Sequence, residues 1–251
     1  MRNKGCGKIF LIDIKRAVWN PGFMIGGLGL SIILMRTVWE FREFPGTVPI
    51  MEICSLPMAL SGFTIFSAAF PAWGYANQFY KEEKSKYSYF ILSRMSWRKY
   101  LIMRIFSVSV SGFAIMAIPM GITFGFAYEM GSSEMGSLFS GMHVCDIIVK
   151  YGIPVVLCIK TCLGGLYGIF WALIGFGSSL LVKNKYVPYL IPFILNQFFW
   201  IVFSEHPKLN PVFLVRGEDL DCYSLSAFIL LCYCLIAALV SAVIFRKRVI
   251  Q

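Results

Sequence analysis

The chain has little charge, almost no histidine and no phosphate-binding loop, and each shortage excludes a class of protein. Charged residues make up 14% of the 251 positions and hydrophobic residues 58%, whereas soluble domains carry about 25% charged residues. Two histidines, His143 and His206, are too few for a histidine-based metal site within the membrane. The pattern Gly-x-x-x-x-Gly-Lys-Ser/Thr is absent. We therefore expect a membrane protein that is not an enzyme and holds no cofactor or metal of its own.

Long apolar runs are what the chain has in abundance. A membrane-spanning helix needs about 20 mostly apolar residues, and six stretches reach or approach that length. They cover residues 21–39, 54–77, 101–127, 155–182, 186–203 and 224–245. The expected fold class is all-α, a polytopic membrane protein with six transmembrane helices that form a single domain over residues 1–251.

The distribution of charge predicts how these spans are oriented. With the N-terminus placed inside, the inner segments hold 17 basic residues and three acidic ones, whereas the outer segments hold five basic and ten acidic residues. Because basic residues concentrate on the cytoplasmic side of membrane proteins, both termini are expected in the cytoplasm. Topology thus accounts for the net charge of +10, and nothing favours a nucleic-acid partner.

The segment before the first span has the pattern of a short amphipathic helix. Its apolar residues share one helical face, and its basic residues lie largely on the other: Phe10, Leu11, Ile14, Ala17 and Val18 against Lys8, Lys15 and Arg16. Such a helix suits the inner membrane interface. The alternative is a basic anchor that only fixes orientation.

A charged island, residues 78–100, separates the second and third expected spans. Together with Arg104 it holds seven of the 23 basic residues. Its aromatic and aliphatic residues recur at helical spacing between basic ones, which predicts a short amphipathic helix at the cytoplasmic surface. A solvated loop that merely follows the charge rule is the alternative.

A set of motifs in and around this island resembles a known family. The motifs are Phe70-Pro-Ala-Trp73, Phe79, Glu82-Glu83, Ile91-Leu-Ser-Arg-Met-Ser96, Lys99-Tyr100 and Arg104. They resemble the second span and first cytosolic loop of type-2 ATP-binding-cassette (ABC) transporter permeases. The outer Leu209-Asn-Pro211 is similar to another element of that family.

The resemblance implies a function and a set of partners. Residues 78–100 would contain a coupling helix that docks on a separate ATPase subunit. The complex would hold two such ATPase subunits, which carry the ATP and Mg. A second copy or a homologous permease would complete the pathway, in a bacterial cytoplasmic membrane. The substrate would be a hydrophobic or amphipathic molecule such as a peptide, drug or lipid, and the expected direction of transport is export. The coupling residues would be Glu82, Glu83, Tyr87, Tyr89, Leu92, Arg94, Ser96, Lys99, Tyr100 and Arg104.

Three other functions remain open at this point. One is a non-transporting membrane subunit, and another is an ATP-independent carrier, which buried charges in the spans would favour. The third is an intramembrane protease, because Glu82-Glu83 superficially resembles a paired-glutamate motif. The arginine expected a few residues later and the histidines at membrane depth are missing for that third function.

Polar residues within the spans are the remaining candidates. Asn196 and Gln197 would either line a substrate path or bond neighbouring helices. Lys160 is expected near the outer interface, where its ammonium can reach water, and Pro154 is expected to kink its helix. Cys145 and Cys222 are expected outside and could pair.

Overall fold

The structure, a computed structural model, describes residues 4–43, 45–60, 62–86, 90–91, 93, 95–133, 148, 150–182, 184–216 and 223–250. Within these ranges all regular secondary structure is helical, which confirms the all-α class. Cys145 and Cys222 lie outside the described residues.

Four helices are long and apolar enough to cross a membrane. They are α2 (Pro21–Glu40), α8 (Trp97–Met130), α10 (Ile153–Leu181) and α13 (Tyr223–Ile250). Each coincides with a predicted span, extended by a few residues at one or both ends. Asn20 begins α2, since its side chain accepts a hydrogen bond from the Gly22 amide at 3.1 Å, and Pro21 occupies the first helical position.

The other two predicted spans have a different form. Residues 54–77 fall into α3 (Ile50–Leu60), α4 (Phe63–Phe66) and α5 (Ala69–Tyr75), followed by α6 (Gln78–Lys84). Pro57 removes a backbone donor from α3, and Gly62 precedes α4; both residues disfavour an unbroken helix. Residues 186–203 form α11 (Val187–Val202), which has 16 residues. Short helices η1 (Phe41–Glu43), η3 (Pro207–Leu209) and α12 (Pro211–Arg216) complete the described elements.

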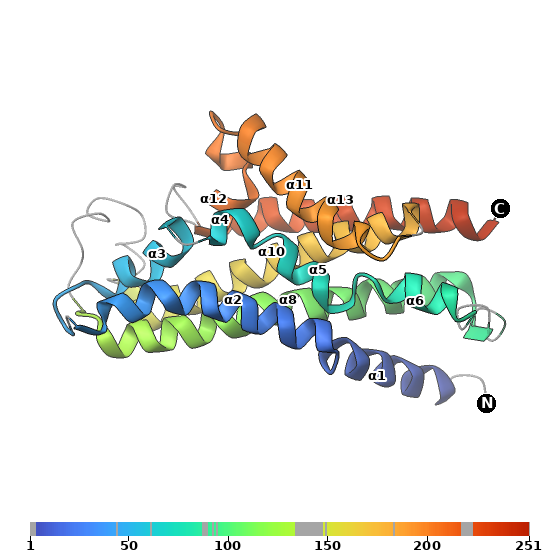
Figure 1. The fold of residues 1–251 in the computed structure, drawn as a ribbon, viewed down its shortest axis with the longest axis horizontal. Coiled ribbons are helices and arrows are strands. Elements are labelled where there is room, and N and C mark those ends of the chain that lie inside the picture. Colours follow the sequence, from blue (N-terminus) through green and yellow to red (C-terminus); the bar gives the residue numbers. More distant parts are fainter. Residues whose placement is uncertain are drawn as a thin grey trace.

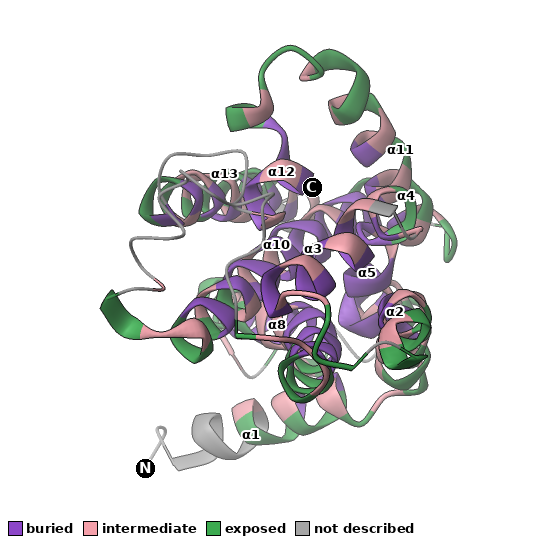
Figure 2. Cartoon of the chain, turned by 90° about the vertical axis from the view of Figure 1, so that its left-hand side faces the viewer, coloured by how far each residue is buried: buried purple, intermediate pink, exposed green. Residues whose placement is uncertain are grey.

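Helix α10 is the centre of the bundle, because α5, α8, α11 and α13 all pack on it. Figure 2 shows the buried residues gathered around this helix. The contact with α8 is close: a Cβ added at Gly112 would lie 2.5 Å from the Gly168 carbonyl oxygen. Glycine at both positions therefore lets the two helix backbones approach each other.

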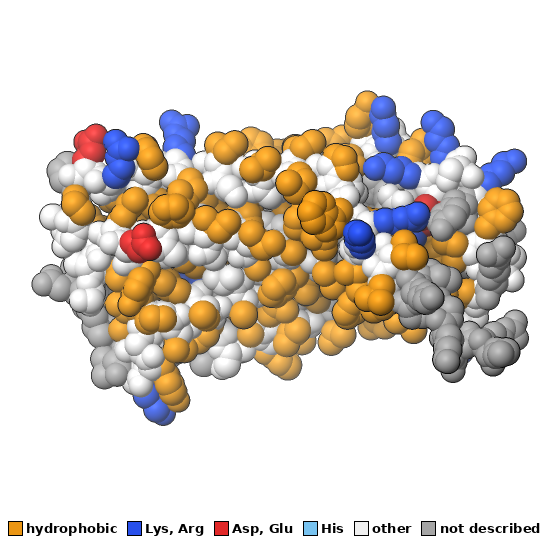
Figure 3. Space-filling model, turned by 90° about the horizontal axis from the view of Figure 1, so that it is seen from below, with side chains coloured by type: hydrophobic (Ala, Val, Ile, Leu, Met, Phe, Trp, Pro, Cys, Tyr) orange, Lys and Arg blue, Asp and Glu red, His pale blue; other side chains and the backbone are white. Residues whose placement is uncertain are grey.

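Charged side chains gather towards the two ends of the bundle (Figure 3), and the chain termini mark one of these ends (Figure 1). Both chain termini and α6 lie at the same end (Figure 1), which we call the basic end. Figure 3 shows a broad hydrophobic belt in the middle of one face, with Lys and Arg side chains towards the two ends. This arrangement is that of a helical membrane protein.

The predicted N-terminal helix is confirmed as α1 (Lys4–Val18). Its Asp13 and Ala17 are buried against the bundle, whereas Leu11 is 67% exposed. The Phe10 ring packs on Phe106 of α8, with 5.2 Å between ring centroids. Lys15 is exposed, so part of each face of the helix remains open.

One expectation for α10 is wrong, and a second is met at a neighbouring residue. Lys160 is fully buried and its Nζ donates to Ser55 Oγ at 3.1 Å, so it does not reach the water. Ser55 of α3 supplies a hydrogen-bond partner in place of water, which a count of residues along one helix cannot show. Pro154 lies in the first turn of α10, where proline is tolerated. The interruption expected near it is at Gly152, whose φ of +84° separates the helical residues 150–151 from α10.

Candidate functional site: a buried ionic cluster

Four helices meet at the basic end and bring five polar side chains together. We call this group the ionic cluster; its members are Asp13 of α1, Tyr75 of α5, Glu82 of α6, and Tyr100 and Arg104 of α8. Tyr100 and Arg104 are four residues apart, which places them on one face of α8. All five side chains are almost fully buried.

Arg104 is the centre of the cluster, because its guanidinium binds two carboxylates from different helices. Its Nη1 donates to Asp13 Oδ1 at 3.0 Å, and its Nη2 donates to Glu82 Oε2 in a short contact. Arg104 has no exposed surface, and Glu82 is 3% exposed. Arginine suits this position because its planar group offers several donors in fixed directions.

The two tyrosines add one hydrogen bond to each carboxylate. The Tyr75 hydroxyl donates to Asp13 Oδ1 at 2.5 Å, and the Tyr100 hydroxyl donates to Glu82 Oε2 at 3.0 Å. The guanidinium carbon of Arg104 also lies 5.1 Å from the Tyr75 ring centroid and 5.3 Å from that of Tyr100. The aromatic faces thus stabilise the cation while their hydroxyls stabilise the anions.

The cluster joins helices that are far apart in the sequence. Removing one partner of such a buried pair leaves an uncompensated charge and costs about 3–5 kcal/mol. Any movement of α6 that separates Glu82 from Arg104 meets this penalty. The cluster therefore couples the position of α6 to α1 and α8.

A second ionic contact ties α6 to the last helix. Glu83 accepts two hydrogen bonds from Arg248 Nη2 of α13, at 2.6 and 2.9 Å. Arg248 Nη1 also donates to the carbonyl oxygens of Ser179 and Leu180 at the end of α10. A cation at a helix C-terminus satisfies unpaired carbonyl groups there. The two adjacent glutamates thus connect α6 to opposite parts of the bundle.

The predicted coupling residues occupy three different environments. Glu82, Tyr100 and Arg104 are buried in the ionic cluster, and Glu83 is partly buried in its pair with Arg248. Ser96 and Lys99 are exposed at the start of α8. The others, Tyr87, Tyr89, Leu92 and Arg94, lie outside the described residues.

Three members of these contacts, Asp13, Tyr75 and Arg248, are not among the residues predicted from the sequence. One signal could have identified Asp13: it lies three residues after Phe10 and four before Ala17, on the same helical face as both. A carboxylate on that face needs a partner when it is buried. No comparable local signal distinguishes Tyr75 or Arg248.

The two predicted pathway residues bind the backbone of α4. Asn196 is 1% exposed and its Nδ2 donates to the Thr64 carbonyl at 2.8 Å, while Gln197 Nε2 donates to the Ile65 carbonyl at 3.1 Å. Both contacts are hydrogen bonds between neighbouring helices, the second of the two roles expected for these residues. They hold α11 to the broken second apolar segment.

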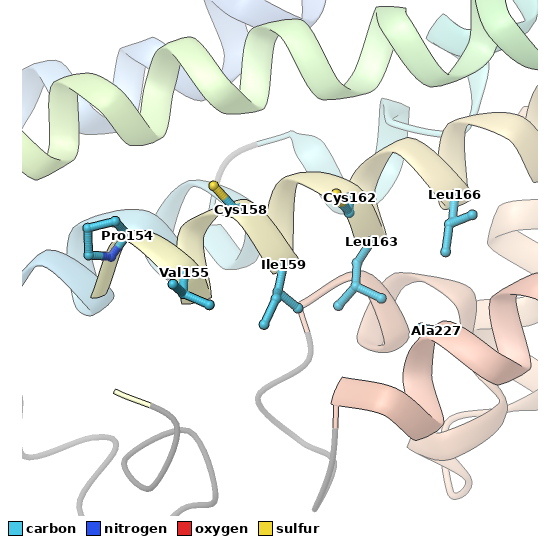
Figure 4. Close-up of a pocket in the computed structure, with 8 residues that line it drawn as sticks. All are labelled: Pro154, Val155, Cys158, Ile159, Cys162, Leu163, Leu166 and Ala227. Carbon is cyan, nitrogen blue, oxygen red and sulfur yellow. The ribbon is translucent and has the colours of Figure 1, made fainter. Parts of the chain in front are cut away.

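An apolar pocket lies at the other end of α10. It has a volume of about 370 Å³ and is lined by α10 residues and Ala227 of α13. Figure 4 shows Cys158 and Cys162 among these residues. Both are exposed free thiols. The described residues contain no group of three or more His, Cys, Asp or Glu side chains that could hold a metal ion.

Comparison with known proteins identifies no protein that is similar to this chain. No family model, no curated protein and no solved structure matches this chain.

Proposed function

We propose that the chain is the membrane subunit of an ATP-driven transporter of the type-2 ABC permease kind. The proposal includes six membrane crossings, with α3–α5 as the second and α11 as the fifth, and cytoplasmic termini. The basic end would then face the cytoplasm, where residues 85–96 between α6 and α8 would meet a separate ATPase.

One observation carries the proposal: α6 forms ion pairs with α8 and α13, and through Arg104 of α8 it is also connected to α1. Glu82 binds Arg104, which also binds Asp13, and Glu83 binds Arg248. A force applied next to α6 would therefore move α1, α8 and α13 together. Such a connection is what a partner needs if ATP binding outside the membrane is to change the arrangement of helices within it.

This geometry alters the role proposed for the predicted residues. Glu82 and Arg104 are buried, so they would position the coupling segment and not contact the ATPase. Exposed residues such as Phe90, Ser93 and Lys99 would supply the contact surface. The substrate would be a hydrophobic or amphipathic molecule, exported or extracted from the inner leaflet.

A matched pair of variants on α6 tests the proposal. Glu83→Gln weakens the contact with Arg248, whereas Lys84→Gln changes the neighbouring exposed residue. With the ATPase subunits co-reconstituted in vesicles, Glu83→Gln should leave the complex assembled but lower the substrate moved per ATP hydrolysed. Lys84→Gln should change neither quantity. Equal transport per ATP in both variants would contradict the coupling role of α6.

An ATP-independent carrier is a second candidate, favoured by the buried Lys160. Ionisable residues buried within membrane segments often mark substrate or ion pathways. Transport by the purified chain alone, abolished in Lys160→Met and unaffected in Lys150→Met at an exposed position, would establish this function instead.

A further inference from the structure

An apolar groove runs along α10 between α11 and α13, in the half of the bundle towards the basic end. Its volume is about 410 Å³, within the range of ligand sites in proteins. Phe170 and Leu181 mark its extent on α10, while Leu195 of α11 and Val240 of α13 belong to its walls. The groove is separate from the ionic cluster, which contains none of its residues.

The length of the groove matches one leaflet of a bilayer. The interval from Phe170 to Leu181 corresponds to about 16 Å of helix at 1.5 Å per residue. One leaflet contributes half of a hydrocarbon core that is about 30 Å thick. A single acyl chain lying along α10 would therefore extend from the basic end to the middle of the membrane.

Two lysines follow the groove-lining segments in the chain, at the basic end. Tyr233, Ala237, Val240 and Ile244 line the groove at helical spacing, and Lys247 is the next residue of α13 on that face. Lys185 lies in the connection between α10 and α11.

Both cations are exposed, and within the part of the chain that the structure describes neither forms an ion pair. Arg248, by contrast, is already bound to Glu83. An anion at the end of the groove would therefore meet available positive charge.

We propose that this groove binds an anionic phospholipid, with one acyl chain between α11 and α13 and the phosphate at Lys185 and Lys247. The apolar walls account for the chain, and the two lysines account for the headgroup charge. The site does not depend on the proposed transport function, because every residue that forms it belongs to this chain. A bound lipid would hold α11 and α13 at a fixed separation on α10.

Native mass spectrometry of the purified full chain tests the site without any ATPase. The chain is released from micelles that contain equal amounts of dioleoyl-phosphatidylglycerol and dioleoyl-phosphatidylcholine, and the retained lipids are counted. Each lysine near an anionic headgroup contributes about a fivefold preference. Lys185→Ala/Lys247→Ala should therefore lower the preference for phosphatidylglycerol by about twentyfold or more, whereas Lys99→Ala should leave it unchanged.

A second pair of variants tests the groove itself. Val240→Trp fills the groove, and Val243→Trp adds the same bulk to the same helix outside it; the two valines are 52% and 56% exposed. Val240→Trp should lose the retained phosphatidylglycerol and Val243→Trp should keep it.

Three outcomes would overturn the proposal. The first is equal retention of both lipids, which would indicate a neutral lipid site. The second is equal behaviour of the two tryptophan variants. The third is a lipid-free dimer that Val240→Trp dissociates, which would make the groove a contact between two copies of the chain.

Discussion

Replacing Arg104 with methionine should destabilise the chain more than any other single change at the basic end. The substitution keeps much of the side-chain volume but removes the cation that Asp13 and Glu82 share. Two buried carboxylates would then remain without their charged partner, at a cost of about 3–5 kcal/mol.

The assay is thermal unfolding of the detergent-purified protein, monitored by fluorescence-detected size-exclusion chromatography. For a protein of this size, the loss of stability in Arg104→Met corresponds to a fall of roughly 10 °C in the midpoint of thermal unfolding. Arg98→Met is the matched control, because Arg98 lies on the same helix and is exposed, with its guanidinium carbon 5.4 Å from the Trp97 ring centroid. Its cost should stay below about 1 kcal/mol.

A triple variant separates charge from packing. Asp13→Asn/Glu82→Gln/Arg104→Met removes all three charges together, so no uncompensated charge remains, and it should recover much of the stability that Arg104→Met loses. The reasoning is refuted if Arg104→Met is as stable as Arg98→Met. It is also refuted if the triple variant unfolds no later than Arg104→Met alone.

Two further predictions concern the packing of the bundle, and the same unfolding assay measures both. Gly112→Ala should cost about 1–3 kcal/mol, because the new Cβ would lie 2.5 Å from the Gly168 carbonyl oxygen; Gly125→Ala on the same helix meets no atom within 4 Å and should stabilise by about 0.5–1 kcal/mol. A lower midpoint for Gly125→Ala than for Gly112→Ala would contradict this account. Asn196→Leu should cost about 1 kcal/mol through its lost bond to α4, and more than Gln197→Leu, whose side chain is less buried. A reversed order would show that the Asn196 amide does not hold α11 in place.

The sequence predicted those parts of the fold that depend on local composition. Long apolar runs predicted α2, α8, α10 and α13, since the number of apolar residues needed to cross a membrane is fixed by bilayer thickness. The placement of apolar and basic residues on different helical faces likewise predicted α1. The division of residues 54–77 into three helices was not predicted, although Pro57 and Gly62 give its physical reason.

The ionic cluster could be predicted only in part, because its contacts join distant residues. Asp13 and Arg104 are 91 positions apart, and Glu83 and Arg248 are 165 apart. Motif resemblance selected Glu82, Glu83 and Arg104, but no periodicity identifies their partners. The contact of Lys160 with Ser55 joins residues 105 positions apart, so it too required the packed structure.

The central claim is that residues 85–96 dock on a separate ATPase, and photo-crosslinking from position 90 tests it most directly. Phe90 is 67% exposed at the basic end, and Phe228 of α13 is 64% exposed far from it. With p-benzoyl-phenylalanine at either position in cells, the account predicts that position 90 alone captures a protein whose sequence contains a phosphate-binding loop. Capture of no such ATPase from position 90, or equal capture from both positions, would contradict it.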